Sequence, residues 1–303
     1  MSASPIPDHA VVGASDPDRA VAFYTAFGFT ERRRGTIDAA AAHALYGLDG
    51  PVDEVVLGVD GSDHGLLRIV ATPLAAPDRG DFHRGGHALD LYSTDVEASV
   101  AIARDQGAVA GPIADYPFGP VHLTQAQAYA PDHVPLVFVG IDHRLPSVLD
   151  ERPELGHSEL HSIVACVDGI DAETDFWIDV VGLRKQSAFP IDVPAVSEFM
   201  MLPRHAPVRM SVMRGPESLP PRFELLAFDD ADGRYAASRP LVPGGLLLGL
   251  SIEDVSGFVA HLAAHGARTG EVVEAPGLHG GLQQAAWACT PGGVDFEVRG
   301  PTR

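Results

Sequence analysis

The stretch Asp8-His9-Ala10-Val11-Val12 returns in the second half of the chain as Leu160-His161-Ser162-Ile163-Val164. His9 and His161 stand 152 residues apart, which is about half of the 303-residue chain. After each histidine, an aspartate, an aromatic pair and a glycine follow in the same order. A repeat on this scale predicts that the chain is built from similar structural units.

A second pattern lies between the two copies of the first. It consists of Gly85-Gly86 followed by Asp95-Val96. It recurs 159 residues later as Gly244-Gly245 followed by Asp254-Val255. The units therefore alternate in the order A-B-A-B, which predicts four modules along the chain.

Each unit carries the same succession of predicted elements. The first opens with an apolar strand from His9 to Ala14, after which Asp16-Pro17 provides a helix cap and a first-turn proline. The buried face of this helix is marked by apolar side chains at helical spacing, Ala20, Phe23, Tyr24 and Phe27. Three further strands are expected near 29–34, 53–59 and 66–71. The remaining units show a similar order, with strands expected near 109–114, 120–129 and 134–140 in the second. The sequence therefore predicts an α+β fold of four βαβββ modules.

Two segments of different composition interrupt this order. Residues 141–157 contain prolines and several charged residues and predict a linker. We therefore expect one domain over residues 1–143 and a second over residues 158–303, each with two modules. A second long connection is expected at 216–243, with an apolar piece at 223–228 and a turn sequence at 230–233.

The composition excludes several classes of partner. With 21 basic and 41 acidic residues, the formal net charge is −20, which repels nucleic-acid phosphates and anionic membranes. No apolar run approaches the ~18 residues of a membrane span, and Met1 to Asp8 lacks the features of a signal peptide. The two cysteines, Cys166 and Cys289, are too few for a disulfide framework. We therefore expect a cytoplasmic protein whose partner is a small molecule.

Two stretches carry a resemblance to a known family. The first strand and helix, His9 to Phe29, and the closing segment Thr290-Pro291-Gly292-Gly293-Val294-Asp295-Phe296-Glu297 resemble the vicinal oxygen chelate superfamily. This superfamily includes glyoxalase I, bleomycin-resistance and fosfomycin-resistance proteins and extradiol dioxygenases. The resemblance implies that the four modules pair into two open glyoxalase-like barrels, one in each half of the chain.

The resemblance also implies where a divalent metal would be bound. Family ligands stand on the first strands of paired modules and near the end of the last strand, so that several nitrogen and oxygen atoms converge. In the N-terminal half, His9 and His87 match first-strand positions, but no glutamate stands near Val137. In the C-terminal half, His161 and Glu297 match, but Leu246 stands where the second histidine is expected.

Neither half therefore has a complete triad, which argues against extradiol dioxygenase activity. Because a carboxylate can neutralise a metal and accept a proton, we favour the C-terminal barrel, with His161 and Glu297 as metal ligands or Glu297 as a general base. The metal would be Fe, Mn, Zn, Ni or Mg, or there would be none. The pocket is expected to be lined by Leu246, Leu248, Trp287 and His279.

Three functional alternatives follow from the incomplete ligand sets. The first is an isomerase or lyase that acts on a small oxygenated molecule through an enolate-like state, with a metal in a reduced site. The second is a binding protein like the bleomycin-resistance members, for which the acidic surface would suit a cationic ligand. The third is a metal-free enzyme of the same fold. The protein is expected to be a monomer or a homodimer.

Overall fold

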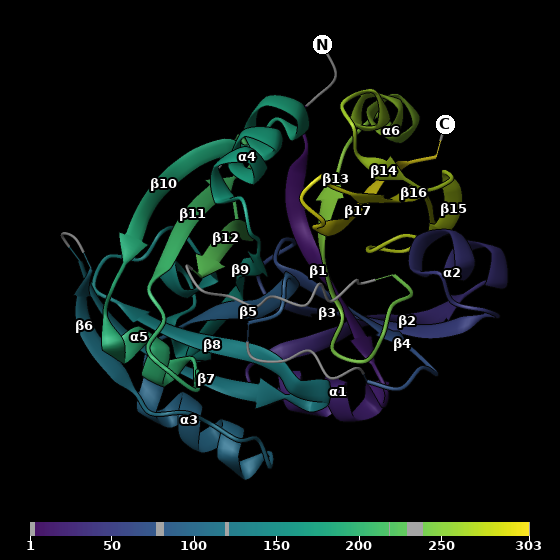
Figure 1. Ribbon diagram of the computed structural model, residues 1–303. Coiled ribbons are helices and arrows are strands. Elements are labelled where there is room, and N and C mark those ends of the chain that lie inside the picture. The colour runs from purple at the N-terminus through teal and green to yellow at the C-terminus, as the bar shows by residue number, and fades with distance from the viewer. Residues whose placement is uncertain (1–3, 77–81, 119–120, 218, 229–238, 303) are drawn as a thin grey trace.

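The computed structural model describes residues 4–76, 82–118, 121–217, 219–228 and 239–302. The fold is α+β and consists of two strongly curled sheets, which lie side by side in Figure 1. One sheet combines the first and fourth modules and is called the terminal sheet here. The other combines the second and third modules and is called the central sheet. The predicted architecture of four modules in two open barrels is thus confirmed.

The terminal sheet has the strand order β14-β16-β17-β13-β1-β4-β3-β2, and β15 pairs with β16. The bounds of its strands, as far as the described residues show them, are β1 Ile6–Ala14, β2 Phe29–Ile37, β3 Val52–Val59, β4 Leu66–Ala71, β13 Leu246–Ser251, β14 Arg268–Thr269, β15 Val273–Pro276, β16 Leu282–Cys289 and β17 Asp295–Pro301. β1 pairs antiparallel with β13, with His9 opposite Gly249. This pairing joins the first module to the fourth.

The central sheet has the order β10-β11-β12-β9-β5-β8-β7-β6. Its described strands are β5 Gly85–Ser93, β6 Ala114–Phe118, β7 Val121–Ala130, β8 Val134–Ile141, β9 His157–Cys166, β10 Arg184–Ile191, β11 Val208–Arg214 and β12 Arg222–Phe228. β5 and β9 pair antiparallel at its centre, as β1 and β13 do in the other sheet.

This strand order corrects the expected pairing of modules. Consecutive halves, 1–143 and 158–303, were expected to form one barrel each. Instead, the first strand of the chain pairs with β13 of the fourth module, and β5 pairs with β9 across the predicted linker. The first strand of each module has a free edge that can pair with the first strand of whichever module lies beside it. The order of the modules in the sequence does not determine which module that is.

Helices pack both against the core that the two sheets share and against the interiors of the sheets. Their described bounds are α1 Pro17–Thr25, α2 Ala39–Tyr46, α3 Val96–Asp105, α4 Ile170–Asp175 with a π-helical continuation Phe176–Val181, α5 Pro194–Phe199 and α6 Val255–Ala264, with short 3₁₀ turns at Pro131–His133, Val148–Asp150 and Pro153–Leu155. As predicted, the Asp16 side chain accepts from the Arg19 amide and caps α1. The residues expected on its buried face, Ala20, Phe23, Tyr24 and Phe27, are all buried.

One large apolar core is shared by the two sheets. Alternate residues of β1, Ala10 and Val12, face this core, whereas Val11 faces a separate cluster inside the terminal sheet. Leu246 and Leu248 belong to the shared core, so their expected place in a ligand pocket is wrong. A Cβ atom on Gly86 would lie 2.4 Å from the Leu246 carbonyl oxygen, so glycine is required where the two sheets approach.

Two strand assignments from the sequence are also corrected. Residues 223–228, expected as a piece of a connection, form most of β12, which pairs with β9 near the middle of the central sheet. The strand expected at 109–114 is reduced to a single bridge at Ala110, and the following strand begins at Ala114. The turn expected at 230–233 lies outside the described residues. Cys166 and Cys289 are both buried and unbridged, and no helix among the described residues is long and apolar enough to span a membrane.

Gly249 provides a test of the join between the chain ends. Its missing side chain leaves room for the His9 ring, because a Cβ atom there would lie 2.0 Å from His9 Cε1. We predict that Gly249→Ala destabilises the protein by about 1–3 kcal/mol, as overpacking of a full core does. Urea denaturation measures this change. The control is Gly169→Ala, where an added Cβ meets nothing within 4 Å; equal stabilities of the two variants would contradict the packing argument.

Candidate functional site

The terminal sheet contains a buried ionic cluster centred on Glu297 of β17. Its Oε1 accepts a hydrogen bond from His9 Nε2 at 3.0 Å and lies 3.3 Å from Arg68 Nη1. Its Oε2 accepts from the Tyr46 hydroxyl at 2.5 Å, and Arg299 Nε donates to Oε1. All five side chains are essentially inaccessible to solvent. The carboxylate is therefore fully compensated by donors from four different elements.

The cluster extends beyond this carboxylate on two sides. Arg68 Nε donates to Glu54 Oε2 at 2.5 Å, and Arg33 donates to the other oxygen of Glu54. On the opposite side, Asp8 accepts a hydrogen bond from His9 Nδ1. Each buried charge in this chain of contacts thus has a partner of opposite sign.

These contacts determine the protonation of the cluster. Burial by itself would lower the pKa of His9, but Asp8 and Glu297 outweigh it and raise that pKa to about 9. The imidazole is therefore protonated at neutral pH and donates from both nitrogens. Burial opposes ionisation of Glu297, but Arg68 and His9 together lower the pKa of this carboxyl below its ordinary value.

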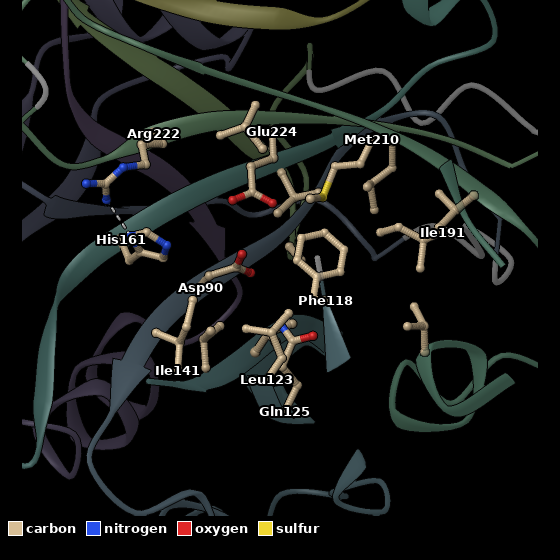
Figure 2. A pocket seen from close by; sticks show the side chains of 18 of the residues that line it. Asp90, Phe118, Leu123, Gln125, Ile141, His161, Ile191, Met210, Arg222 and Glu224 are labelled. Atoms are coloured by element: carbon tan, nitrogen blue, oxygen red, sulfur yellow. Dashed lines mark hydrogen bonds between the residues drawn. The ribbon is translucent and has the colours of Figure 1, made fainter. Parts of the chain in front are cut away.

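The central sheet, in contrast, encloses a pocket of about 230 Å³. Its walls are mainly apolar and come from all eight strands and from α5, with Phe118, Leu123, Ile141, Phe189, Ile191 and Met210 among them. Figure 2 shows Phe118, Leu123, Ile141, Ile191 and Met210 around the open space. Such a pocket, apolar with a few polar groups, is the usual form of a small-molecule site.

Two carboxyl groups face one another in this pocket. Figure 2 shows that Asp90 of β5 and Glu224 of β12 point toward each other from the two strands that flank β9. The Ser162 hydroxyl donates to Glu224 Oε1 at 2.7 Å. Burial raises the pKa of Asp90 well above its ordinary value, and the charge of Glu224 raises it further. Burial likewise raises the pKa of Glu224, against the lowering effects of Ser162 and Arg222.

A histidine at the inner end of the pocket is held by an arginine and a tyrosine. Arg222 Nη1 lies 2.6 Å from His161 Nδ1, and the imidazole is stacked on the Tyr92 ring with 3.7 Å between centroids. A guanidinium has no acceptor, so it donates to Nδ1 and the neutral ring carries its proton on Nε2. Burial lowers the pKa of His161 well below its ordinary value, and Arg222 lowers it further. Figure 2 shows the opposite edge of the ring turned toward Asp90.

Comparisons with known proteins agree with the resemblance noted in the sequence. Residues 6–138 match the family described as the Glyoxalase/Bleomycin resistance protein/Dioxygenase superfamily. The sequence match covers residues 6–138, and over the rest of the chain the likeness to solved structures concerns the fold alone. No curated protein matches the sequence.

Two solved structures illustrate how far the fold extends. Glyoxalase I from Zea mays is similar with a TM-score of 0.64 and 15% identity, over 98% of this chain and 92% of that one. A putative dioxygenase from Bacillus subtilis subsp. subtilis str. 168 is similar with a TM-score of 0.66 and 12% identity, over 100% of this chain and 87% of that one. At these identities the likeness concerns the fold alone.

Neither sheet offers a donor set that suits the metal implied by the resemblance. In the terminal sheet, both nitrogens of His9 donate hydrogen bonds, and the cation Arg68 is in contact with Glu297. In the central sheet, His161 presents an N–H to the pocket, whereas a metal-binding imidazole must offer a lone pair. Within the described ranges, no three His, Cys, Asp or Glu side chains are grouped so that they could hold a metal ion.

The residues expected to form the site are distributed over both sheets. His9 and Glu297 come together in the terminal sheet, whereas His87 and His161 line the pocket of the central sheet. The expected pairs, His9 with His87 and His161 with Glu297, are therefore wrong, because they assumed barrels made of consecutive modules. Glu297, saturated by four donors, cannot act as a general base.

Two residues expected in the substrate pocket lie elsewhere. Trp287 belongs to the hydrophobic cluster inside the terminal sheet, and its indole N–H donates to Asp295 Oδ1 at 3.0 Å. His279 is exposed in the loop between β15 and β16, where it lines a hollow together with Arg32. Neither residue lines the pocket of the central sheet.

Several functional groups were missed by reasoning from the sequence. Asp90, Glu224, Arg222 and Arg68 were not singled out, although each stands within or at the start of an apolar strand. A charged residue flanked by apolar ones in a strand indicates a buried charge, and buried charges are concentrated at functional or ion-paired sites. A charged residue flanked by apolar ones in a predicted strand was therefore the sequence signal that could have identified these four residues.

The His9 contacts predict a fall of stability in alkaline solution. The pKa of His9 is about 9 in the folded protein against 6.5 in the unfolded chain. Its contribution is fully present below pH 6.5 and is lost as the pH rises through 9, by about 3 kcal/mol in total. Urea denaturation at pH 6.5, 8 and 9.5 measures this fall. In His9→Gln the fall should be absent; parallel pH dependence of parent and variant would contradict the assignment.

Proposed function

We propose that the protein is a metal-independent enzyme of the isomerase or lyase type that acts in the pocket of the central sheet. Its substrate is a small oxygenated organic molecule with an apolar body, and the reaction is a proton transfer next to a carbonyl group. The observation that carries the proposal is a pair of carboxyl groups, the buried Asp90 and the half-buried Glu224, which face each other in an apolar cavity.

The environment of this pair supports acid–base chemistry. Two carboxyl groups that face each other away from water resist double ionisation, so that one holds a proton while the other is a carboxylate. Asp90 is buried, and its Oδ1 has no hydrogen-bond partner among the described residues. A buried acceptor without a partner is costly in a core but useful in a site that awaits a substrate.

The proposed reaction needs no further reactant. The ionised carboxylate removes a proton from the carbon beside the substrate carbonyl, so that a C–H bond breaks and a carboxyl O–H bond forms. The electron pair moves onto the carbonyl oxygen, which is stabilised by the protonated carboxyl and by the His161 Nε2–H group. Return of a proton to another atom of the substrate completes an isomerisation, and departure of a neighbouring group completes an elimination. Arg222 acts as a positioning residue because it fixes the His161 tautomer.

A second candidate function is the binding of an organic cation without turnover. The chain carries a formal net charge of −20, which attracts cations. The pocket is also rich in acceptors, since Gln127 Oε1 and Asp90 Oδ1 are buried without partners among the described residues. A protonated amine could bind between the two carboxyl groups.

The acid–base proposal is tested by proton exchange in D₂O. We predict that the protein, dialysed against EDTA, catalyses deuterium incorporation beside the carbonyl of at least one member of a panel of small hydroxycarbonyl compounds with apolar tails. Asp90→Asn and Glu224→Gln should each lower this rate by about 10²–10⁴-fold. NMR measures the exchange.

The matched control is Glu97→Gln, an exposed carboxylate of α3, which should leave the rate unchanged. Ligand binding measured by calorimetry separates the two candidate functions. Amines that bind the parent, but not Asp90→Asn, with no compound undergoing exchange, would support the binding protein. Exchange that requires added metal would contradict the proposed enzyme.

The same pair predicts an effect on stability. Because the folded pKa of Asp90 is raised by burial and by Glu224, its contribution to stability is present at low pH and is lost as the pH rises above about 4. Asp90→Asn should therefore have a higher melting temperature than the parent at pH 8, and the difference should disappear at pH 4. A lower melting temperature of the variant at pH 8 would show that the carboxylate is well compensated in the folded state.

A further inference from the structure

A further buried acceptor lies in the pocket of the central sheet, apart from the carboxyl pair. Gln127 of β7 lines the pocket and is only 2% exposed. Asp90 of β5 is the partner of Val137 of β8, and Val137 is in turn the partner of Gln127, so the three residues form one row across neighbouring strands. Since two strand spacings separate them, the backbones of Asp90 and Gln127 are about 10 Å apart along the sheet.

The orientation of the Gln127 amide is determined by its surroundings. Its Nε2 donates to the backbone carbonyl of Met200, at the end of α5, at 3.1 Å. A carbonyl oxygen can only accept, so the other arm of the amide must be Oε1. The backbone carbonyl of Gln127 also accepts from the Gly111 amide at 2.9 Å. The residue is therefore held through both its main chain and its side chain, and the acceptor is preorganised.

Gln127 differs in this respect from its neighbour in the pocket. Gln125 stands two residues earlier on the same strand, and its Oε1 accepts from the Tyr116 hydroxyl. Gln127 Oε1, in contrast, has no hydrogen-bond partner among the described residues. A buried acceptor of this kind is costly in a core, and a donor on a bound molecule would satisfy it.

We infer that Gln127 determines substrate specificity, because its Oε1 accepts a hydrogen bond from a hydroxyl or amide N–H group on the body of the substrate. The inference rests on the proposed function, which places the substrate carbonyl at Asp90 and Glu224. The substrate class is then a carbonyl compound with a neutral donor at its far end and an apolar middle, since Val137 lies between the two polar positions. An ether oxygen in place of the donor would face Oε1 with lone pairs on both sides and be rejected.

Matched ketones provide the test. The probes are benzylacetone, its para-hydroxy derivative and its para-methoxy derivative, in which a ring and two methylenes separate the carbonyl from the variable group. We expect the parent protein to bind the para-hydroxy compound at least about tenfold more tightly than the other two, as measured by calorimetry. Gln127→Met, with an unbranched apolar side chain, should bring the ratio of the dissociation constants close to one.

Gln125→Met is the matched control, because it alters the same residue type on the same strand where the acceptor is already engaged. It should preserve the ratio. Loss of the preference in both variants, or equal binding of the three ketones to the parent, including no binding of any, overturns the inference. If Gln127→Met does not fold, the ratio shared by the parent and Gln125→Met decides in the same way.

Proton exchange in D₂O separates this inference from the proposed function. A hydroxyl preference that Gln127→Met removes, without exchange in any ketone, supports the role of Gln127 and contradicts only the proposed enzyme. Exchange at equal rates in all three ketones supports the enzyme and overturns the role of Gln127.

Discussion

The carboxylate of Glu297 imposes the main constraint on this structure. A charge so far from water is tolerable only if donors surround it, and those donors come from β1, α2, β4 and β17. The first module can supply three of them only if it lies beside the fourth. The ionic cluster and the pairing of β1 with β13 therefore depend on one another, and together they bring the chain ends into one sheet.

The two sheets have the same construction but differ in how their buried polar groups are compensated, and their histidines show the difference. His9 has an acceptor, Asp8, at Nδ1, and its other nitrogen is engaged by Glu297. His161 has a donor, Arg222, at Nδ1, which leaves an N–H for the pocket. In the terminal sheet the buried carboxylates of Glu54 and Glu297 are paired with arginine side chains, and apolar side chains pack inside the sheet. In the other, carboxyl groups remain under-compensated beside a cavity, which is the usual signature of a working site.

The internal repeat was sufficient to predict the modules, because strands and helices follow local periodicity and caps. The first strand, the helix capped by Asp16 and the closing strand with Glu297 were all located from sequence. Partner choice was not predictable, since which first strand lies beside His9 depends on packing across the whole chain. That single uncertainty misplaced His87 and Leu246. The missed carboxyl pair had a different cause: Asp90 and Glu224 are far apart in sequence and meet only because their strands flank β9.

The union of β1 with β13 also affects how the protein is made. All strands of the central sheet lie between residues 85 and 228, so they emerge from the ribosome in one continuous stretch. β1 is synthesised first but must wait for residues 246–251 before its free edge is covered. During that interval the nascent chain exposes an apolar strand edge that can pair with other chains. Slow translation after residue 228 would prolong the interval in which this edge is uncovered.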